Sequence, residues 1–236
     1  MDSIKNILFL DIETVPNCSE FDLLNEQEKV LWQKKSQQLR YYKDNNPEDD
    51  QNYNYERAGI YAEFGKIICI SVGYYANDQF RIKSFAGHDE KVILTDFAAL
   101  LNNYFNKSNT QLCAHNGKEF DFPYISRRMI IHKIKLPRVL DNSGKKPWEV
   151  NHLDTMEMWK FGDYKNYTSL ELLAYIMNIP TPKSDIDGSM VADVYYKEKN
   201  LERIVNYCNQ DVLTVARIYC YMKNLGYIAD QDVVVV

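Results

Sequence analysis

The sequence of 236 residues predicts an α/β fold in which helices flank a mixed β-sheet. Three strand-like segments follow one another early in the chain, and helical and strand-like patterns alternate after them. An apolar content of 45% is enough for a substantial core, most simply in a single domain that spans residues 1–236. The sequence shows no internal repeat.

The first predicted strand, residues 7–14, is a short apolar run that contains two acids near its end, Asp11 and Glu13. Side chains alternate along a strand, so both carboxylates project from the same face. Sites in open α/β sheets lie at the carboxyl ends of strands, and adjacent carboxylates repel unless cations hold them. The pair therefore indicates a divalent-metal site. Taken by itself, however, it is better explained by a strand that runs out into solvent at Asp11.

A polar insertion at about residues 17–65 follows this strand. Within it, residues 20–42 are predicted to form a helix, because acids come early and bases late, the order that suits the helix dipole. Residues 44–56 are rich in Asn and Asp and are predicted to form a loop. The insertion forms either a flap over the two acids or a peripheral helix, and we favour the helix.

The rest of the chain is read from apolar periodicity and turn residues. Strands are predicted at 66–74 and 79–85, joined by a turn at Asn77-Asp78, at 111–114, and finally at 150–153, with Asp154 capping the next helix. Helices are predicted at 91–105, 122–132, 169–177 and 190–197, before a long final helix with an apolar stripe from 201 to 219.

Two more acidic motifs follow. Asn116 precedes Phe120-Asp121 between a strand and a helix, and Asp121 taken alone is best explained as a helix cap. Tyr207 and Asp211 are four residues apart in the final helix, so they share one face at the edge of its apolar stripe. A Tyr-x-x-x-Asp pattern is expected about once by chance in a chain with this many tyrosines, so it is weak by itself.

The order and placement of the three motifs together resemble the DEDD exonucleases of the ribonuclease H-like (DnaQ-like) superfamily. Tyr207 matches the DEDDy branch, because the histidine branch would have His at position 206, which is Asn here. The closest resemblance is to the predicted 3′–5′ exonucleases related to the proofreading domain of family B DNA polymerases. It extends from residue 7 to about residue 221 and includes segments 64–67, 153–155 and 183–188. No polymerase domain follows, so a free-standing nuclease is expected.

The resemblance implies two divalent ions on either side of the scissile phosphate. Asp11 would bridge both ions, Glu13 and Asp211 would complete the shell of the first, and Asp121 would hold the second. Tyr207 would orient the attacking water. Four carboxylates without a histidine suit hard ions such as Mg²⁺ or Mn²⁺.

The resemblance also implies contacts with the substrate. Lys183 would steady the charge of the scissile phosphate, although an exposed surface lysine is an equal alternative. Thr14 and Asn116 would contact the terminal nucleotide. Phe120 would pack against its base or fill the core instead.

The formal net charge of −5 looks unfavourable for a nucleic-acid partner. If four of the 33 acids hold metal ions, however, 29 acids face 28 bases. Local basic clusters could then contribute to binding, and the candidates are Lys34-Lys35, Arg127-Arg128, the group Lys133, Lys135 and Arg138, and Lys145-Lys146. The expected substrate is the 3′ end of single-stranded nucleic acid, with DNA preferred over RNA. The alternatives are an exoribonuclease and a nucleic-acid-binding module that has lost catalysis.

The sequence also predicts a cytoplasmic location. The first five residues lack the pattern of a signal peptide, and no apolar segment approaches the length of a membrane span. The five cysteines form no Cys-x-x-Cys pair, which favours free thiols in a reducing compartment and argues against a zinc site.

Overall fold

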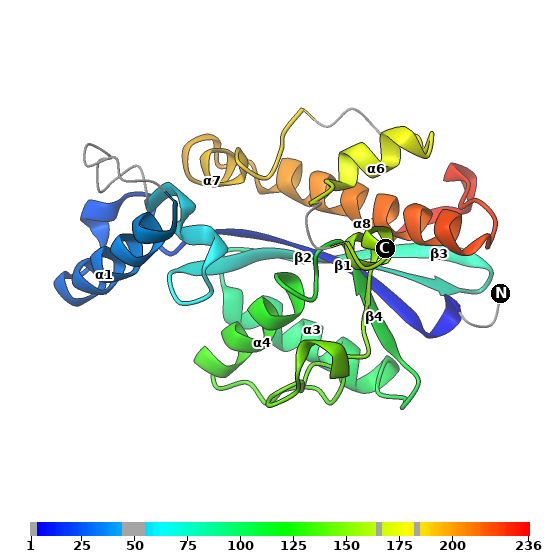
Figure 1. The fold of residues 1–236 in the computed structure, drawn as a ribbon, viewed down its shortest axis with the longest axis horizontal. Helices are drawn as coiled ribbons and strands as arrows, with labels where there is room; N and C mark the ends of the chain where they lie inside the picture. Colours follow the sequence, from blue (N-terminus) through cyan, green and yellow to red (C-terminus); the bar gives the residue numbers. More distant parts are fainter. Residues whose placement is uncertain (1–3, 44–54, 164–166, 182–184) are drawn as a thin grey trace.

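The computed structural model describes residues 4–43, 55–163, 167–181 and 185–236. In these ranges six strands form one mixed sheet in the order β5-β4-β1-β2-β3-β6 (Figure 1). The strands are β1 (Ile7–Pro16), β2 (Gly65–Ala76), β3 (Gln79–Ala86), β4 (Gln111–Ala114), β5 (Leu153–Asp154) and β6 (Val233–Val235). β1 pairs antiparallel with β2 and parallel with β4, so it lies inside the sheet. The predicted α/β class with a mixed sheet is confirmed.

Helices cover both faces of the sheet (Figure 1), α3 and α4 on one side and α6, α7 and α8 on the other. The helices are α1 (Glu26–Lys43), α3 (Glu90–Tyr104), α4 (Asp121–Ile131), α5 (Thr155–Lys160), α6 (Leu170–Ile176), α7 (Val191–Asp193) and α8 (Leu201–Lys223). Short 3₁₀ turns are η1 (Ile4–Asn6), η2 (Phe21–Leu23), η3 (Glu56–Ile60), η4 (Pro147–Glu149) and η6 (Asp230–Asp232), and η5 (Val194–Glu198) is π-helical. None of the described helices is long and apolar enough to cross a membrane.

The alternation of β1 decides where its acids point. Leu8, Leu10 and Ile12 pack into the core beneath α3 and α4. Phe9 packs on the opposite face with the apolar residues of α8. Asp11 continues that second row, and Glu13 follows it, so both carboxylates face α8 rather than the α3–α4 layer.

The hairpin between β2 and β3 forms at the predicted turn. Asn77 and Asp78 both have left-handed backbone angles, with φ of 52° and 59°. Two consecutive left-handed residues are the geometry of a type I′ turn, whose twist matches that of the strands it joins. The β2–β3 register follows directly from this turn, with Ala76 opposite Gln79.

Three predicted boundaries were wrong. The first helix begins at Glu26 rather than at residue 20, because Asn25 and Glu28 each accept a hydrogen bond from the other's backbone N–H and so cap the helix there. The strand predicted at 150–153 is only Leu153–Asp154, and it is not the last, since β6 pairs with β3 near the end of the chain. The helix predicted at 190–197 divides into α7 and the π-helical η5.

The described part of the insertion at 17–65 has a small apolar cluster of its own around Trp32, with Phe21, Leu24, Tyr55 and Ala58. Helix α1 lies at one end of the molecule (Figure 1), as expected for a peripheral helix rather than for a flap over the two acids of β1. Most of the loop predicted at 44–56 falls outside the described residues.

One of the expected basic clusters has a structural role. Arg128 is 6% exposed, and its guanidinium binds both carboxylate oxygens of Glu90 and the backbone oxygen of Ala62. Only Arg127 of the Arg127-Arg128 pair is exposed. The pair therefore does not form a basic surface cluster.

Candidate active site

The site opens where β1 and β4 separate. β4 pairs with β1 only along Ile7–Phe9, and the chain then leaves the sheet through Asn116 and Gly117. A Cβ at Gly117 would come within 2.4 Å of the Cβ of Ala114, so this tight turn requires glycine. The turn brings the N-terminus of α4 to the uncovered edge of β1.

Asp121 is the first residue of α4, and Phe120 occupies the N-cap position. The interpretation of Asp121 as a simple helix cap is therefore wrong. Its buried carboxylate accepts hydrogen bonds from its own N–H and from the N–H of Ile12, which lies between Asp11 and Glu13 on β1. Asp121 is fixed beside the two acids of the first motif in this way.

A β-bulge lies beside Glu13. Glu13 is opposite Cys69 and Thr14 is opposite Ile67, so Ile68 is an extra residue on β2. Bulges bend a strand and redirect side chains, and they are frequent next to active sites. This bulge lets Glu13 and Cys69 face α8 while Thr14 turns toward Tyr124, whose hydroxyl oxygen accepts a hydrogen bond from the Thr14 side chain and donates to the carbonyl of Gly59.

Helix α8 supplies the remaining groups. The Tyr207 hydroxyl donates a hydrogen bond to the Asp211 carboxylate. On the next position of the helix, the Cys208 thiol donates to Asp11, with its Sγ 3.3 Å from Oδ2. One possible ligand atom each from Asp11, Glu13 and Cys208 lie within 4.8 Å of one another.

Burial raises the pKa of all four carboxylates, and charges within the group raise those of Asp11 and Glu13 further. Burial raises the pKa of Asp11 well above its ordinary value, and the charges of Glu13, Asp211 and Asp121 raise it further. Burial, with the charges of Asp211 and Asp121 among the other causes, raises the pKa of Glu13 in the same way. Burial raises the pKa of Asp121 to about 7 and that of Asp211 to about 6. These shifts place all four acids in one electrostatic site.

Among the described residues, no cation forms an ion pair with these carboxylates. None of the ion pairs among the described residues involves Asp11, Glu13, Asp121 or Asp211. Buried carboxylates that lack cationic partners are costly, and oxygen donors in such a group are the ligands that Mg²⁺ and Mn²⁺ prefer. The donor set therefore fits hard divalent ions.

Asp154 has a role that the sequence pattern did not reveal. It caps α5 as predicted, accepting hydrogen bonds from the N–H groups of Met156 and Glu157. In addition, its carboxylate accepts from the backbone N–H groups of Asn116 and Lys118, at 3.0 and 3.1 Å. One buried carboxylate thus holds the loop that leads to Asp121. Only tertiary structure brings the two segments together, because 38 residues separate Asp154 from Asn116.

The loop residue Asn116 is strained and incompletely satisfied. Its backbone is left-handed, with φ of 63°, and its buried Oδ1 has no hydrogen-bond partner among the described residues. Strained backbone and unpaired polar atoms persist where the surrounding structure enforces them, often at binding sites.

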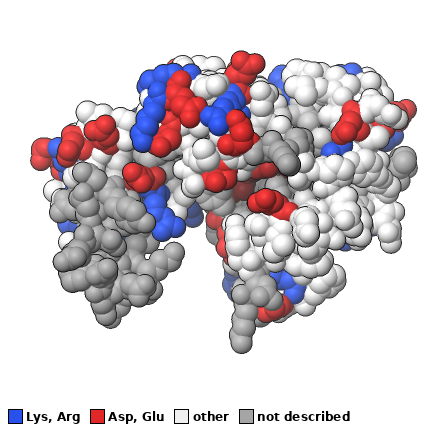
Figure 2. All heavy atoms as spheres, turned by 90° about the horizontal axis from the view of Figure 1, so that it is seen from above, with Lys and Arg blue, Asp and Glu red and all other residues white. Residues whose placement is uncertain are grey.

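A cleft of about 760 Å³ lies beside the acids, lined by residues of α6, α8 and the segment 185–190. Asp11, Tyr207 and Asp211 all line it. His115 also lines it and joins two parts of the wall, because its ring nitrogens contact the Thr155 hydroxyl and the Thr168 carbonyl oxygen. Acidic side chains gather near the middle of this face (Figure 2).

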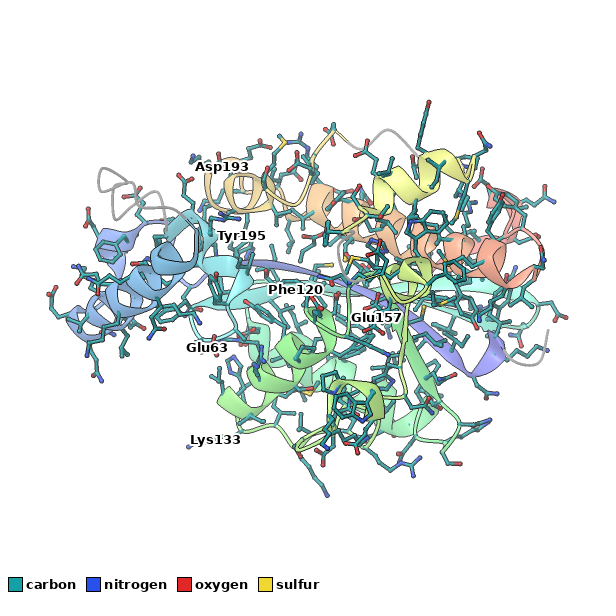
Figure 3. The ribbon with its side chains drawn as sticks, in the orientation of Figure 1. Glu63, Phe120, Lys133, Glu157, Asp193 and Tyr195 are labelled. Atoms are coloured by element: carbon teal, nitrogen blue, oxygen red, sulfur yellow. The ribbon has the colours of Figure 1, made fainter. Side chains whose placement is uncertain are left out.

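Phe120 and Lys183 are the other residues expected to contact the substrate. Phe120, labelled in Figure 3 at the start of α4, packs against Tyr124 with ring centroids 5.3 Å apart and is partly exposed. It therefore both joins the core and presents an edge to solvent. Lys183 lies outside the described residues.

Residues 57–232, about three quarters of the chain, match the model of a family described as predicted 3′–5′ exonucleases related to the exonuclease domain of PolB. The chain belongs to this family. The mixed sheet flanked by helices is consistent with its ribonuclease H-like exonuclease fold. No curated protein gives a significant match to the chain.

Membership in this exonuclease family supports nuclease activity and implies a nucleic-acid substrate. The match covers Asn116, Asp121, Tyr207 and Asp211, but Asp11 and Glu13 precede it. Two observations connect those acids with the part of the chain that the family model matches. The Ile12 N–H donates a hydrogen bond to the Asp121 carboxylate, and the charges of Asp121 and Asp211 raise the pKa of Asp11.

Proposed function

We propose that this protein is a metal-dependent 3′–5′ exonuclease that hydrolyses single-stranded nucleic acid, DNA in preference to RNA, and releases nucleoside 5′-monophosphates. The observation that carries the proposal is the convergence of Asp11, Glu13, Asp121 and Asp211 without a cationic partner among the described residues. A module that only binds a polyanion gains nothing from four buried acids, so the cluster favours catalysis over binding alone.

The carboxylates would hold two divalent ions, Mg²⁺ or Mn²⁺, with Asp11 between them, Glu13 and Asp211 on one side and Asp121 on the other. Such ions supply nucleophilic water near neutral pH and stabilise the departing oxygen. In the hydrolysis a water oxygen bonds to phosphorus, the bond from phosphorus to the 3′ oxygen breaks, and that oxygen takes up a proton. The products are the terminal nucleoside 5′-monophosphate and a strand shortened by one nucleotide.

The residues of the chain would orient the reactants. Burial and the nearby acids raise the pKa of the Tyr207 phenol far above its ordinary value, so this side chain keeps its proton. A neutral phenol that donates to Asp211 is suited to orient a water molecule and unsuited to act as a base. Asn116, on the loop that leads to Asp121, would contact the terminal nucleotide.

Replacing Tyr207 by phenylalanine is expected to reduce turnover about tenfold to a hundredfold, because only the hydroxyl that orients water is removed. Metal binding should be unchanged, since the four carboxylates remain. Turnover on a single strand at saturating Mg²⁺ and saturating Mn²⁺ measures the effect. Wild-type turnover with both ions would show that Tyr207 has no such role.

Strands labelled at either end test the proposed function. We expect a 5′-labelled DNA strand to shorten one nucleotide at a time and a 3′-labelled strand to release labelled mononucleotide at once. Blocking the 3′ end with phosphate should suppress degradation. A blunt duplex should react more slowly, because fraying costs about 1–2 kcal/mol for each pair that opens.

Matched RNA strands in the same assay measure the preference between DNA and RNA. Faster degradation of RNA would assign the activity to an exoribonuclease. Efficient cutting of a closed circular single strand would show an endonuclease and contradict the proposal.

A further inference from the structure

Two lysines and two tyrosines form a group at the carboxyl end of β1, defined here as the Lys66 group: Lys66, Tyr195, Tyr196 and Lys199. The Lys66 ammonium lies 5.1 Å from the ring centroid of Tyr195 and 5.5 Å from that of Tyr196. The Lys199 ammonium lies 5.9 Å from the Tyr196 ring. Such cation–π contacts hold a lysine in place without neutralising its charge.

The tyrosines themselves are firmly held. Their rings pack edge to face with centroids 4.9 Å apart. The Tyr196 hydroxyl donates to the backbone oxygen of Pro16, and the Tyr195 hydroxyl is 3.0 Å from Nδ1 of His88. Their backbone belongs to the π-helical turn η5, a local irregularity that is frequent at functional sites.

The positive charge of the group is unpaired within the described part of the chain. No ion pair there involves Lys66 or Lys199, whereas Lys197, on the same turn, pairs with Asp193 at 2.8 Å. Burial lowers the pKa of Lys66, and the charges of Arg128 and Lys199 act in the same direction, although those of Cys18 and Glu90 oppose the shift. A bound anion would stabilise a half-buried ammonium that lies beside a second cation, because it would offset their positive charge.

The group lies on the same side of the sheet as the acids. Val15, two residues beyond Glu13, is opposite Lys66 in the β1–β2 pairing and packs in one apolar cluster with Tyr195. Two residues along a strand correspond to about 7 Å. Figure 3 shows Tyr195 on the helix above the sheet and Phe120 at the start of α4, on either side of β1.

The cleft beside the acids is lined by acidic rather than basic side chains. Its described lining includes five carboxylates and neither lysine nor arginine; the acids are Asp11, Glu171, Asp185, Asp187 and Asp211. Asp185 pairs with Arg203, and Asp11 and Asp211 would hold metal ions, but Glu171 and Asp187 would still repel a polyanionic strand that reaches the site through this cleft. The Lys66 group offers the nearby surface on which a phosphate would be attracted instead.

We propose that Lys66 and Lys199, held over the rings of Tyr195 and Tyr196, bind a backbone phosphate of the nucleic-acid strand on the 5′ side of the bond that is cut. The inference rests on the proposed exonuclease function, because the strand direction follows from a 3′ end placed at the carboxylates. The ligand is a phosphodiester of the sugar–phosphate backbone, so the interaction is independent of base sequence.

The test compares two substrates for wild type, Lys66→Gln and Lys199→Gln. One is a 20-nucleotide oligothymidylate, and the other is the p-nitrophenyl ester of thymidine 5′-monophosphate, which has no second phosphate. We expect Lys66→Gln to raise KM for the oligonucleotide about tenfold with kcat unchanged, and Lys199→Gln to raise it by a smaller factor. The slope of log affinity against log salt should fall by about 0.7 for each phosphate that the variant no longer binds.

Hydrolysis of the ester should be unchanged in both variants, which separates phosphate binding from the chemistry. Lys197→Gln is the matched control, because it removes a neighbouring lysine that already pairs with an acid, and its KM should equal that of wild type. Wild-type KM and salt slope in Lys66→Gln and Lys199→Gln would overturn the inference.

If wild type hydrolyses neither substrate, the proposed function fails while phosphate binding by the Lys66 group is still tested. Fluorescence anisotropy of the labelled oligonucleotide, measured with Ca²⁺, then decides. Weaker binding by Lys66→Gln than by Lys197→Gln supports the inference, and equal binding overturns it.

Discussion

Replacing Asp11 by asparagine is expected to lower the rate of phosphodiester hydrolysis by about 10³ or more, which corresponds to about 4 kcal/mol of activation free energy. Asp11 is the acid whose pKa is raised by all three of the other carboxylates, so it lies at the centre of the group. Losing its charge removes the ligand proposed to bridge both ions. Initial rates on a 5′-labelled single strand at saturating Mn²⁺ measure the change.

The same substitution should leave the metal-free protein equally stable or more stable, because it removes one of four charges that repel. Loss of activity would then not reflect unfolding. Asp96→Asn, an exposed acid on α3, is the matched control and should keep wild-type activity. An Asp11→Asn variant with near-wild-type turnover would rule out the assigned site.

Replacing Arg128 by methionine is expected to lower the free energy of unfolding by about 3–5 kcal/mol. Glu90 is 6% exposed and receives hydrogen bonds from Arg128 Nε and Nη2 and from the backbone N–H of Ile67, and its Oε2 lies 2.6 Å from Nε2 of His132. Removing the guanidinium leaves a buried carboxylate with too few partners and frees the carbonyl of Ala62. Urea unfolding followed by circular dichroism measures the decrease in stability.

Arg127→Met is the control, since Arg127 is the exposed neighbour on the same helix. Its effect should stay within about 0.5 kcal/mol. Equal effects of the two substitutions would show that the Glu90–Arg128 pair does not join α3, α4 and β2 as described.

Much of the fold was predictable because local patterns and tertiary structure agree. The alternation in β1, the two left-handed residues at Asn77-Asp78 and the apolar stripe of α8 each specify their element without distant contacts. The strand β6 was not predicted, because three valines at 233–235 become a strand only by pairing with β3. The start of α1 depended on the reciprocal cap between Asn25 and Glu28.

Motif order predicted that the four acids and Tyr207 lie near one another, and their roles in catalysis and metal binding stay predictions. The contacts that position these residues were not predictable from the sequence. They join segments that are distant in the chain: the bulge at Ile68 between β1 and β2, the hydrogen bond from the Ile12 N–H to Asp121, and the hydrogen bond from the Asn116 N–H to Asp154. The unpaired charge of Lys66 likewise appears only when η5 packs over β1 and β2.

The central claim is that the four acids form a divalent-metal site, and the free energy of unfolding as a function of pH tests it most directly. The folded-state pKa values of Asp211 and Asp121, about 6 and about 7, lie above the ordinary value of 3.8. The folded protein therefore binds protons more tightly than the unfolded chain. The resulting stabilisation is fully present below about pH 4 and disappears as the pH rises through 6 and 7.

The measurement is the difference in unfolding free energy between wild type and Asp121→Asn, from pH 4 to pH 8, without metal and with Mn²⁺. Two histidines with pKa values lowered by burial of their rings, the partly exposed His115 and the buried His152, act in the opposite direction, but their effect cancels in this difference. Without metal, wild type should lose stability relative to Asp121→Asn as the pH rises. With Mn²⁺ above pH 7 it should regain stability and exceed the variant, because metal binds the ionised folded protein. A difference that is independent of pH, or equal stabilisation of both proteins by Mn²⁺, would contradict the metal site.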